Sequence, residues 1–261
     1  MPAPPSPFPA GQPCWADLLV QDVERTATFY EHVLGWRVPA SSTNPEGYRV
    51  AKRNGRAVAG IGQQPLEDQG MTPAWTVYLA VADPGEATDR AEAAGAEVGS
   101  EPDQDRGFGR AAVLIDPSGA RVGLWETGSH DGMELVGEPG AMCWSETMTR
   151  DYDASKAFYA EVFGWQLQEI GEGGFRYSVA RVGDEEPFVG VGAMPADAPV
   201  DDASHWTVYF AVEDCDATVA RIPELGGGVP RPPQDSPYGR MSVVAGPEGE
   251  TFAIMQLPDR G

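Results

Sequence analysis

Hydrophobic and polar positions along this chain follow two periods, one of two residues and one of about 3.6 residues. In residues 75–81 every second residue is a large apolar one, which predicts a strand with one buried face. From Val23 to Leu34 the apolar residues recur at helical spacing, Asp22 is a suitable N-cap and Gly35 is typical of the residue after the last turn. The pattern therefore predicts a strand over 75–81 and a helix over 23–34.

The remaining segments of the first half continue the same order. Asn54-Gly55 predicts a tight turn between two short strands. Strands are expected over residues 14–21, 36–38, 48–52, 57–62, 97–99, 110–115 and 121–126, and a second helix over 85–94. The order of one strand, one helix and three strands therefore occurs twice in this half.

The chain then repeats itself. Cys14-Trp15 recurs as Cys143-Trp144, and Gly35-Trp36 recurs as Gly164-Trp165, each 129 residues later. The run Trp-Thr-Val-Tyr at 75–78 recurs 131 residues later. Because Trp and Cys are rare, agreement at a nearly constant offset indicates a duplicated domain rather than a short structural repeat.

The duplication and the Pro- and Gly-rich stretches set the expected boundaries of the domains. An extended, mobile N-terminal arm is expected before the first repeat, because five of its residues are proline. The expected parts are an arm at 1–12, module 1 at 13–127, a linker at 128–141, module 2 at 142–257 and a tail at 258–261.

Charge and composition narrow the possible partners. The chain has 18 Lys and Arg against 40 Asp and Glu, a formal net charge of −22, which repels phosphate backbones and anionic lipids. We therefore expect no nucleic-acid partner and no membrane role, and a small molecule as the partner. Three cysteines without a CxxC pair favour a reducing, cytoplasmic location. The chain is expected to be a monomer with an internal pseudo-dimer, or a homodimer.

A longer motif occurs once in each half. Residues 22–36 and 151–165 share the order Asp, six residues, Phe-Tyr, four residues, Gly-Trp, and Asp116-Pro117 lies before the last strand of module 1. This motif resembles the vicinal oxygen chelate superfamily, which includes glyoxalase I, bleomycin-resistance proteins, fosfomycin-resistance proteins and extradiol dioxygenases. The tandem form that begins each half with Cys-Trp is similar to a group of actinobacterial proteins.

The resemblance covers nearly the whole chain after the arm. It implies an α+β fold of two tandem modules. Each module would be a pair of βαβββ motifs that form a half-open β-barrel with helices outside. The fold alone does not specify the chemistry, because it supports many different activities.

Strand parity separates the residues that should face the helices from those that should line the concave cavity. The apolar side of 75–81 must meet the helices, which leaves the opposite side for the cavity. The predicted cavity residues that contact a ligand are Trp15, Asp17, Thr76, Tyr78, Arg110 and Trp125 in module 1, and Trp144, Glu146, Thr207, Tyr209, Arg240 and Met255 in module 2.

The resemblance also implies where a metal would bind. Metal-using members of the superfamily take ligands from three inward strand positions. Those positions hold Trp15, Thr76 and Gly123 in module 1, and Trp144, Thr207 and Ala253 in module 2. Indole, hydrogen and methyl side chains cannot bind a divalent cation, and a lone Thr hydroxyl is a poor ligand. We therefore expect no metal and no other cofactor, although an unusual site that uses Asp17 or Glu146 with Thr oxygens stays open.

Several of these residues have two interpretations. The two tryptophans, Trp15 and Trp144, either stack on a flat ligand or fill the cavity as core. Asp17 and Glu146 act either as hydrogen-bond acceptors or as a general base with a raised pKa; alternatively they pair with the arginines or lie at a hydrated rim. The same choice applies to Arg110 and Arg240, which either bind an anionic group of a ligand or brace a loop.

Two functions follow from these residues, and a third follows from the family. The first is a metal-independent binding protein that holds a flat, partly apolar metabolite or antibiotic in one or both modules. The alternative is a metal-independent isomerase or lyase that uses Glu146 or Asp17 as catalytic general base. The third is a metal-dependent glyoxalase or dioxygenase with a non-standard metal site.

Overall fold

The computed structural model describes residues 7–40, 47–68, 70–102, 109–127, 130–171, 173–199 and 202–258, and within them the chain forms two α+β modules. The elements of module 1 are β1 (Pro13–Val20), α1 (Val23–Leu34), β2 (Arg49–Arg53), β3 (Arg56–Gln63), η1 (Leu66–Asp68), β4 (Trp75–Ala80), α2 (Pro84–Ala93), β5 (Glu97–Ser100), β6 (Gly109–Ile115) and β7 (Arg121–Thr127). The elements of module 2 are β8 (Met142–Thr149), α3 (Tyr152–Phe163), β9 (Gln166–Glu169), β10 (Tyr177–Arg181), β11 (Val189–Ala193), β12 (His205–Ala211), α4 (Cys215–Arg221), η2 (Pro223–Leu225), β13 (Gly228–Ser236), β14 (Gly239–Ala245) and β15 (Thr251–Gln256).

Each module is built on one mixed sheet that curves without closing. In module 1 the strand order is β2-β3-β1-β4-β7-β6-β5, and in module 2 it is β13-β14-β15-β12-β8-β11-β10-β9. The first strand of each module lies inside its sheet, where it pairs with one parallel and one antiparallel neighbour. This is the expected half-open arrangement of paired βαβββ motifs, with a concave face left free of helices.

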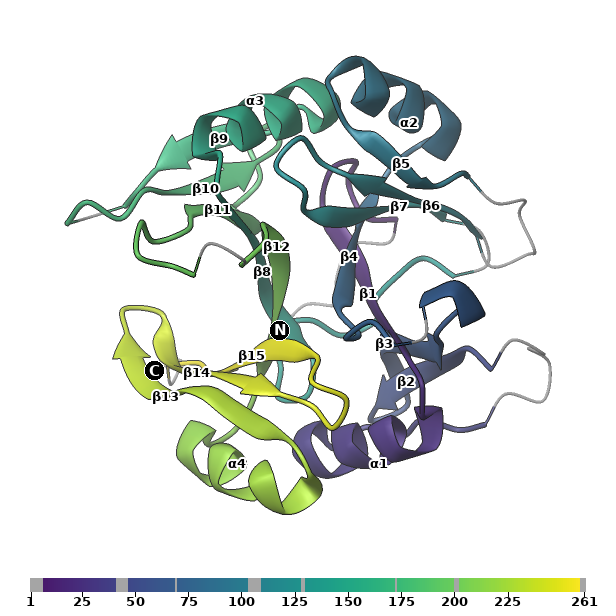
Figure 1. Cartoon of the computed structure of the whole chain (residues 1–261), viewed down its shortest axis with the longest axis vertical. Coiled ribbons are helices and arrows are strands. Elements are labelled where there is room, and N and C mark those ends of the chain that lie inside the picture. The colour runs from purple at the N-terminus through teal and green to yellow at the C-terminus, as the bar shows by residue number, and fades with distance from the viewer. Residues whose placement is uncertain are drawn as a thin grey trace.

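The two sheets lie back to back in the middle of the molecule, with their concave faces directed to opposite sides (Figure 1). Helices lie at the two ends, where α2 is beside α3 and α1 is beside α4 (Figure 1). The apolar faces that alternation predicts as buried are therefore covered both by helices and by the other module. The interface between the modules forms part of the common core.

An aromatic cluster fills part of this interface. Trp36 and Trp75 of module 1 each lie 5.2 Å, between ring centroids, from Phe210 of module 2. Tyr30 on α1 contacts Phe252 of module 2, with 5.3 Å between ring centroids. Burial of several large rings against one another contributes strongly to stability, because each buries a large apolar area.

A pair of reciprocal hydrogen bonds also crosses the interface. The Tyr30 hydroxyl donates to Glu250 Oε1 of module 2 over 3.2 Å, and the Tyr159 hydroxyl of module 2 donates to Asp116 Oδ2 of module 1 over 2.9 Å. In each case a tryptophan of the neighbouring strand donates to the tyrosine hydroxyl. All four residues of the two bonds are buried, so the two modules satisfy each other's buried polar groups.

Two sequence expectations need correction. Residues 36–38 do not form a strand and make only a bridge between Arg37 and Lys52, because Pro39 follows and has no N–H to continue the ladder. The arm is also packed where it is described: Phe8 is buried and Gly11 N donates to Ala80 O. Trp165 Nε1 of module 2 donates to Gly11 O, so this part of the arm contacts both modules.

Candidate functional site

The concave face of module 1 holds a buried carboxyl with three aromatic neighbours. Asp17 and Trp15 lie on the face of β1 opposite to Ala16 and Leu18, as alternation predicts. The Tyr48 hydroxyl donates to Asp17 Oδ2 over 3.3 Å, and the Tyr78 hydroxyl donates to the same oxygen over 3.1 Å. Trp15 Nε1 donates to the Tyr48 hydroxyl over 2.8 Å, which completes a chain from indole to carboxyl.

The concave face of module 2 repeats this arrangement with a longer acid. The Tyr177 hydroxyl donates to Glu146 Oε2 and the Tyr209 hydroxyl donates to Glu146 Oε1, both over 2.6 Å. Trp144 Nε1 donates to the Tyr177 hydroxyl over 3.0 Å. The extra methylene of Glu146 therefore lets each tyrosine bind a separate carboxyl oxygen.

Glycines make room for the tyrosine that comes from the hairpin. A Cβ atom at Gly60 on β3 would overlap the Tyr48 hydroxyl, and one at Gly190 on β11 would overlap the Tyr177 hydroxyl. Both glycines lie beside the carboxyl residue in the neighbouring parallel strand. The close approach of the ring to the backbone is what requires glycine here.

Burial changes the proton affinity of both acids. Desolvation raises the pKa of Asp17 to about 7, and hydrogen bonds from Tyr78 and Tyr48 oppose that rise only in part. Desolvation likewise raises the pKa of Glu146 against the bonds from Tyr177 and Tyr209. Both acids therefore keep their proton to a higher pH than an exposed carboxyl would.

Sequence reasoning missed Tyr48 and Tyr177 as site residues. The signal was present, since the two tyrosines lie 129 residues apart, like the Cys-Trp pairs. A second signal was the Gly-x-Gly pattern that begins at Gly60 and Gly190 on the facing strands. An alternating pair of glycines in a strand indicates that another group approaches the backbone closely.

The linker covers the concave face of module 1. The His130 ring lies 4.4 Å, between centroids, from Trp15, and Trp125 Nε1 donates to His130 O. Met133 N donates to Cys14 O, and the Met133 side chain is buried. Trp15 is consequently only 1% exposed, so this tryptophan belongs to the interior rather than to an open cleft.

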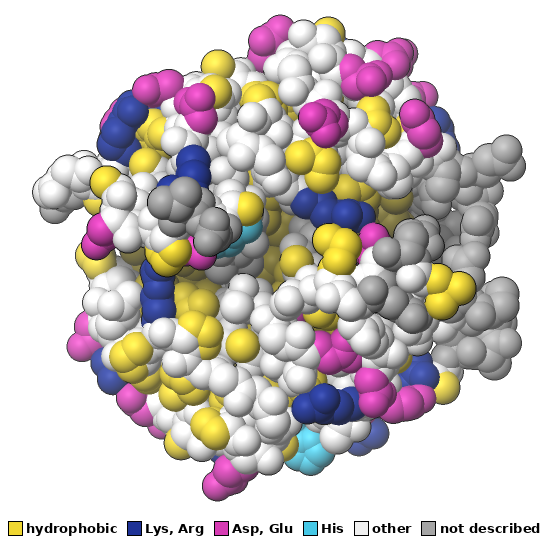
Figure 2. Space-filling model, viewed as in Figure 1, with side chains coloured by type: hydrophobic (Ala, Val, Ile, Leu, Met, Phe, Trp, Pro, Cys, Tyr) yellow, Lys and Arg dark blue, Asp and Glu magenta, His cyan; other side chains and the backbone are white. Residues whose placement is uncertain are grey.

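The concave face of module 2 is more open. Trp144, Glu146 and Tyr177 are half-buried. Trp144 belongs to a small apolar cluster separate from the main core, and its other members are Cys143, Tyr209, Met241, Ala253, Met255 and Leu257. Figure 2 shows hydrophobic side chains in the recesses of one face of the molecule, with acidic side chains mostly around its periphery. Module 2 therefore presents an apolar and aromatic surface beside a partly accessible acid.

The other predicted cavity residues also lie on the concave faces. Thr76 is the cross-strand partner of Asp17, and Thr207 is the partner of Glu146. Trp125 lies with its ring centroid 6.2 Å from that of Tyr78, and Met255 pairs with Met241. Parity thus placed the side chains on the correct face of each sheet.

The two predicted arginines bind protein carboxylates instead. Arg110 Nη1 lies 2.9 Å from Glu126 Oε2 and 3.4 Å from Asp83 Oδ2, next to the start of α2. Arg240 Nη1 lies 2.9 Å from Asp235 Oδ1, and its Nη2 donates to Asp216 on α4. The pairing of Asp17 or Glu146 with these arginines was a wrong alternative, because tyrosines bind both acids.

The positions where the superfamily holds a metal do not offer metal ligands here. The Tyr78 ring lies over Gly123, and Trp15 pairs across the sheet with Tyr78. Within the described ranges, no three side chains of His, Cys, Asp and Glu gather as an ion would require. Since the oxygens of Glu146 also accept tyrosine hydrogen bonds, these residues do not fit the superfamily's metal.

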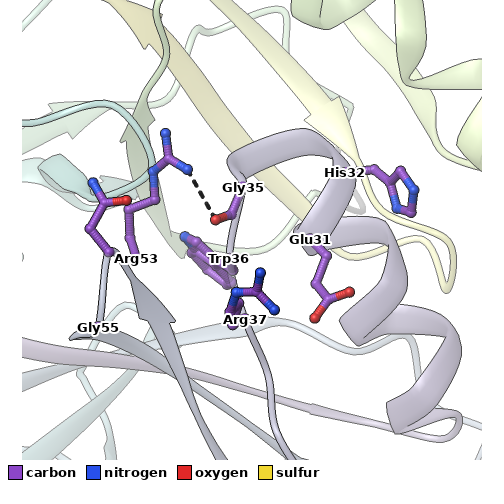
Figure 3. Close-up of a pocket in the computed structure, with 8 residues that line it drawn as sticks. Glu31, His32, Gly35, Trp36, Arg37, Arg53 and Gly55 are labelled. Carbon is purple, nitrogen blue, oxygen red and sulfur yellow. Dashed lines mark hydrogen bonds between the residues drawn. The ribbon is translucent and has the colours of Figure 1, made fainter.

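A separate depression of about 460 Å³ lies away from both concave faces, at the end of α1 (Figure 3). Arg53 lies against the end of the helix there, and its Nη1 donates to Gly35 O over 3.1 Å. The other residues that line this depression are Glu31, His32, Trp36, Arg37, Asn54 and Gly55. None of the predicted site residues lines it.

Comparison with known proteins fits this geometry. The family model for the Glyoxalase/Bleomycin resistance protein/Dioxygenase superfamily matches residues 14–124 and again residues 141–254. The chain therefore belongs to this superfamily, as a tandem of two modules.

Particular relatives match over nearly their full length. The chain is 36% identical to the anthracycline biosynthesis protein DnrV of Streptomyces peucetius, over 96% of this chain and 94% of that one. It is 38% identical to CFP32 of Mycobacterium tuberculosis, provisionally named a glyoxylase, over 96% of this chain and 97% of that one.

Solved structures share the fold at low sequence identity. The Mn(II)-bound glyoxalase from Novosphingobium aromaticivorans superposes with a TM-score of 0.65 at 15% identity, covering 95% of this chain and 82% of that one. The 2,2′,3-trihydroxybiphenyl 1,2-dioxygenase of Sphingomonas wittichii has a TM-score of 0.62 at 15% identity, covering 96% and 92%. At this identity the likeness shows the fold and leaves the chemistry open. In the described part of the chain, no helix is long and apolar enough to cross a bilayer.

Proposed function

We propose that this protein binds a flat, partly apolar small molecule on the concave face of module 2, without a metal ion. The observation that carries the proposal is the difference between the modules. The linker fills the concave face of module 1 around Trp15, whereas Trp144 and Glu146 of module 2 are half-buried. A half-buried aromatic and apolar surface with a few polar groups is typical of small-molecule sites.

The residues of module 2 supply the two kinds of contact that such a ligand needs. Trp144 and Met255 supply apolar surface, and the polarizable sulfur of methionine suits contact with a ring. Glu146, Tyr177 and Tyr209 form a polar group whose members are fixed in position by their mutual hydrogen bonds. Preorganised polar groups lower the entropy cost of binding.

The relative named for anthracycline biosynthesis suggests where to begin the ligand search. Wild-type protein would be titrated with polycyclic aromatic quinones, an anthracycline among them, while tryptophan fluorescence is recorded. Trp144→Leu is expected to weaken binding about tenfold, because a central aromatic contact contributes a kcal/mol or more.

Trp15→Leu is the matched control in module 1. It should lower the melting temperature, because it opens space in a buried cluster, and should leave affinity unchanged below that temperature. Equal loss of affinity in both variants, or no binding of any quinone in the panel, would refute the assignment to module 2.

A second candidate is an isomerase or lyase in which Glu146 acts as general base. The observation that favours it is the raised pKa of a partly accessible acid. Glu146→Gln should then abolish turnover of a bound ligand while binding is retained. If the ligand is recovered unchanged from the wild-type protein, this candidate is excluded and the binding function stands.

A further inference from the structure

One row of side chains crosses the concave face of module 2 from its centre to its edge. Cross-strand pairing joins Trp144 to Tyr209, Tyr209 to Ala253, Ala253 to Val243 and Val243 to Arg231. Paired residues in neighbouring strands direct their side chains to the same face of a sheet. Arg231, on the edge strand β13, therefore belongs to the same concave face as Trp144.

Arg231 differs from two other arginines of module 2, Arg176 and Arg240. Arg176 and Arg240 are both bound to protein carboxylates. The Arg231 side chain is exposed and has no hydrogen bond or ion pair within the described ranges. Desolvation raises the pKa of both Glu146 and Tyr209, and the positive charge of Arg231 opposes that rise in part, so the guanidinium is within electrostatic reach of the central acid.

The strand around Arg231 limits its movement. Pro230 precedes it, and Pro232 and Pro233 follow, so three of its neighbours have a fixed φ and carry no N–H. The Arg231 carbonyl accepts a hydrogen bond from Ser242 Oγ over 2.6 Å, which ties this strand to β14. A cation on a stiffened edge is held ready to bind a ligand at lower entropy cost.

Module 1 provides an internal comparison. Its equivalent row joins Trp15 to Tyr78, Tyr78 to Gly123, Gly123 to Val113 and Val113 to Ser100. Ser100 therefore occupies the position that Arg231 holds in module 2. The module whose concave face is covered by the linker lacks the cation, and the more open module has it.

We propose that Arg231 binds an anionic substituent of the ligand, so that the ligand of module 2 is a planar aromatic acid. This inference rests on the proposed binding function and adds the charge of the ligand to it. The ring system would lie over Trp144 and Tyr209, and its carboxylate or ionised phenol would accept hydrogen bonds from the guanidinium. A guanidinium suits this role because its planar donors match a carboxylate in a bidentate geometry.

The two halves of the ligand are separated on the sheet by the intervening strands. Trp144 on β8 and Arg231 on β13 are four strand spacings apart, which is about 19 Å along the curved sheet. Because the sheet is concave and the arginine side chain is long, the gap to be filled by the ligand is shorter. An extended polycyclic acid fits this separation better than a single ring does.

The test compares an acid with its neutral counterpart. Anthraquinone-2-carboxylate and 2-methylanthraquinone would be titrated into wild-type protein, Arg231→Ser, which installs the residue of module 1, and Arg231→Lys. Arg231→Ser should weaken binding of the acid about tenfold or more, since a charged hydrogen bond is lost, and change binding of the neutral compound less than about twofold. Lysine should restore part of the affinity, because it keeps the charge without the planar donors.

Salt and a control variant separate charge from general damage. Affinity of the wild type for the acid should fall as the salt concentration rises, and this dependence should be reduced in Arg231→Ser. Arg221→Gln, on exposed α4 sequence, should bind both compounds like the wild type. If the neutral compound binds wild type as tightly as the acid, or if Arg231→Ser binds the acid normally, the inference is wrong while the binding function stands. If neither compound binds, both fail.

Discussion

Two buried acids, Asp17 and Glu250, connect the stability of this protein to pH. Burial raises the pKa of each to about 7 from an ordinary value near 4. An acid whose pKa is higher in the folded state keeps its proton there at pH values where the unfolded chain has lost it. The stability that such groups contribute is therefore present at low pH. It decreases as the pH rises from the pKa of the acid in the unfolded chain to its pKa in the folded protein.

We accordingly expect the free energy of unfolding to fall between pH 5 and pH 7, by about 2 kcal/mol for each of these acids. Urea denaturation at a series of pH values measures it. Asp17→Asn combined with Glu250→Gln should flatten the profile, because neither side chain then ionises. A profile that rises over this interval in the wild type would contradict the raised pKa values.

For Arg110 and Arg240 we expect the opposite effect on ligand affinity from that expected for Arg231. Because both bind carboxylates at the surface, Arg110→Gln and Arg240→Gln should leave ligand affinity unchanged. Each should lower the free energy of unfolding only slightly, because exposed ion pairs contribute little to stability. Loss of ligand binding in either variant would restore the sequence-based hypothesis that these arginines bind the ligand.

At the residue scale, the sequence predicted which face of a sheet each site residue occupies better than it predicted the hydrogen-bond partners of those residues. Alternation was sufficient to place Trp15, Asp17 and their counterparts on the concave side. It could not predict that Tyr48 and Tyr177 would bind the two acids, because those tyrosines reach them from a separate hairpin. The covering of Trp15 by His130 depends on the path of the linker, which no strand periodicity specifies.

At the scale of single elements, the glycine strands β3 and β11 determine how the site is assembled. Gly190→Ala should displace Tyr177 from Glu146, because the added methyl overlaps the hydroxyl. The expected cost is about 1–3 kcal/mol of stability, typical of overpacking, together with weaker ligand binding. Thermal unfolding and fluorescence titration measure the two effects.

A glycine without this contact is the control. At Gly228 on β13 an added Cβ would meet only the Cβ of Ala245 at 3.8 Å, an ordinary contact. Gly228→Ala should therefore change stability little. Equal effects of the two substitutions would show that the close approach of Tyr177 is not what Gly190 provides.

Local rules predicted the elements unevenly. The bounds of α1 agree with the sequence because Asp22 caps its start and Gly35 adopts a left-handed conformation at its end. The strand expected at 36–38 is absent because a proline follows it, whereas the corresponding segment of module 2 forms β9. Short strands depend on their neighbours, so the residue pattern alone separates these two cases poorly.

At the scale of the whole molecule, the two modules are joined by hydrogen bonds between buried polar groups. Each of these groups would lack this partner without the other module. Removal of one hydroxyl, as in Tyr30→Phe or Tyr159→Phe, should lower the free energy of unfolding by about 1–3 kcal/mol, because a buried carboxyl loses a donor. Tyr238→Phe is the control, since that side chain is 61% exposed and should have almost no effect.

The same interface predicts cooperative unfolding. Calorimetry should show one transition for both modules, because the aromatic cluster around Trp36, Trp75 and Phe210 belongs to neither module alone. Two separate transitions would contradict it. The sequence predicted the duplication, but not that the buried faces of the two sheets would lie against each other.

The linker over the concave face of module 1 affects which substitutions each module can tolerate during evolution. A replacement beneath His130 is subject to one requirement, that the interior stay filled. A substitution around Glu146 must also preserve the proposed ligand-binding surface on the concave face of module 2. A saturation mutagenesis library can be scored twice, for the abundance of each variant in cells and for its ligand binding. Substitutions that reduce ligand binding without reducing abundance should therefore lie in module 2 and not in module 1.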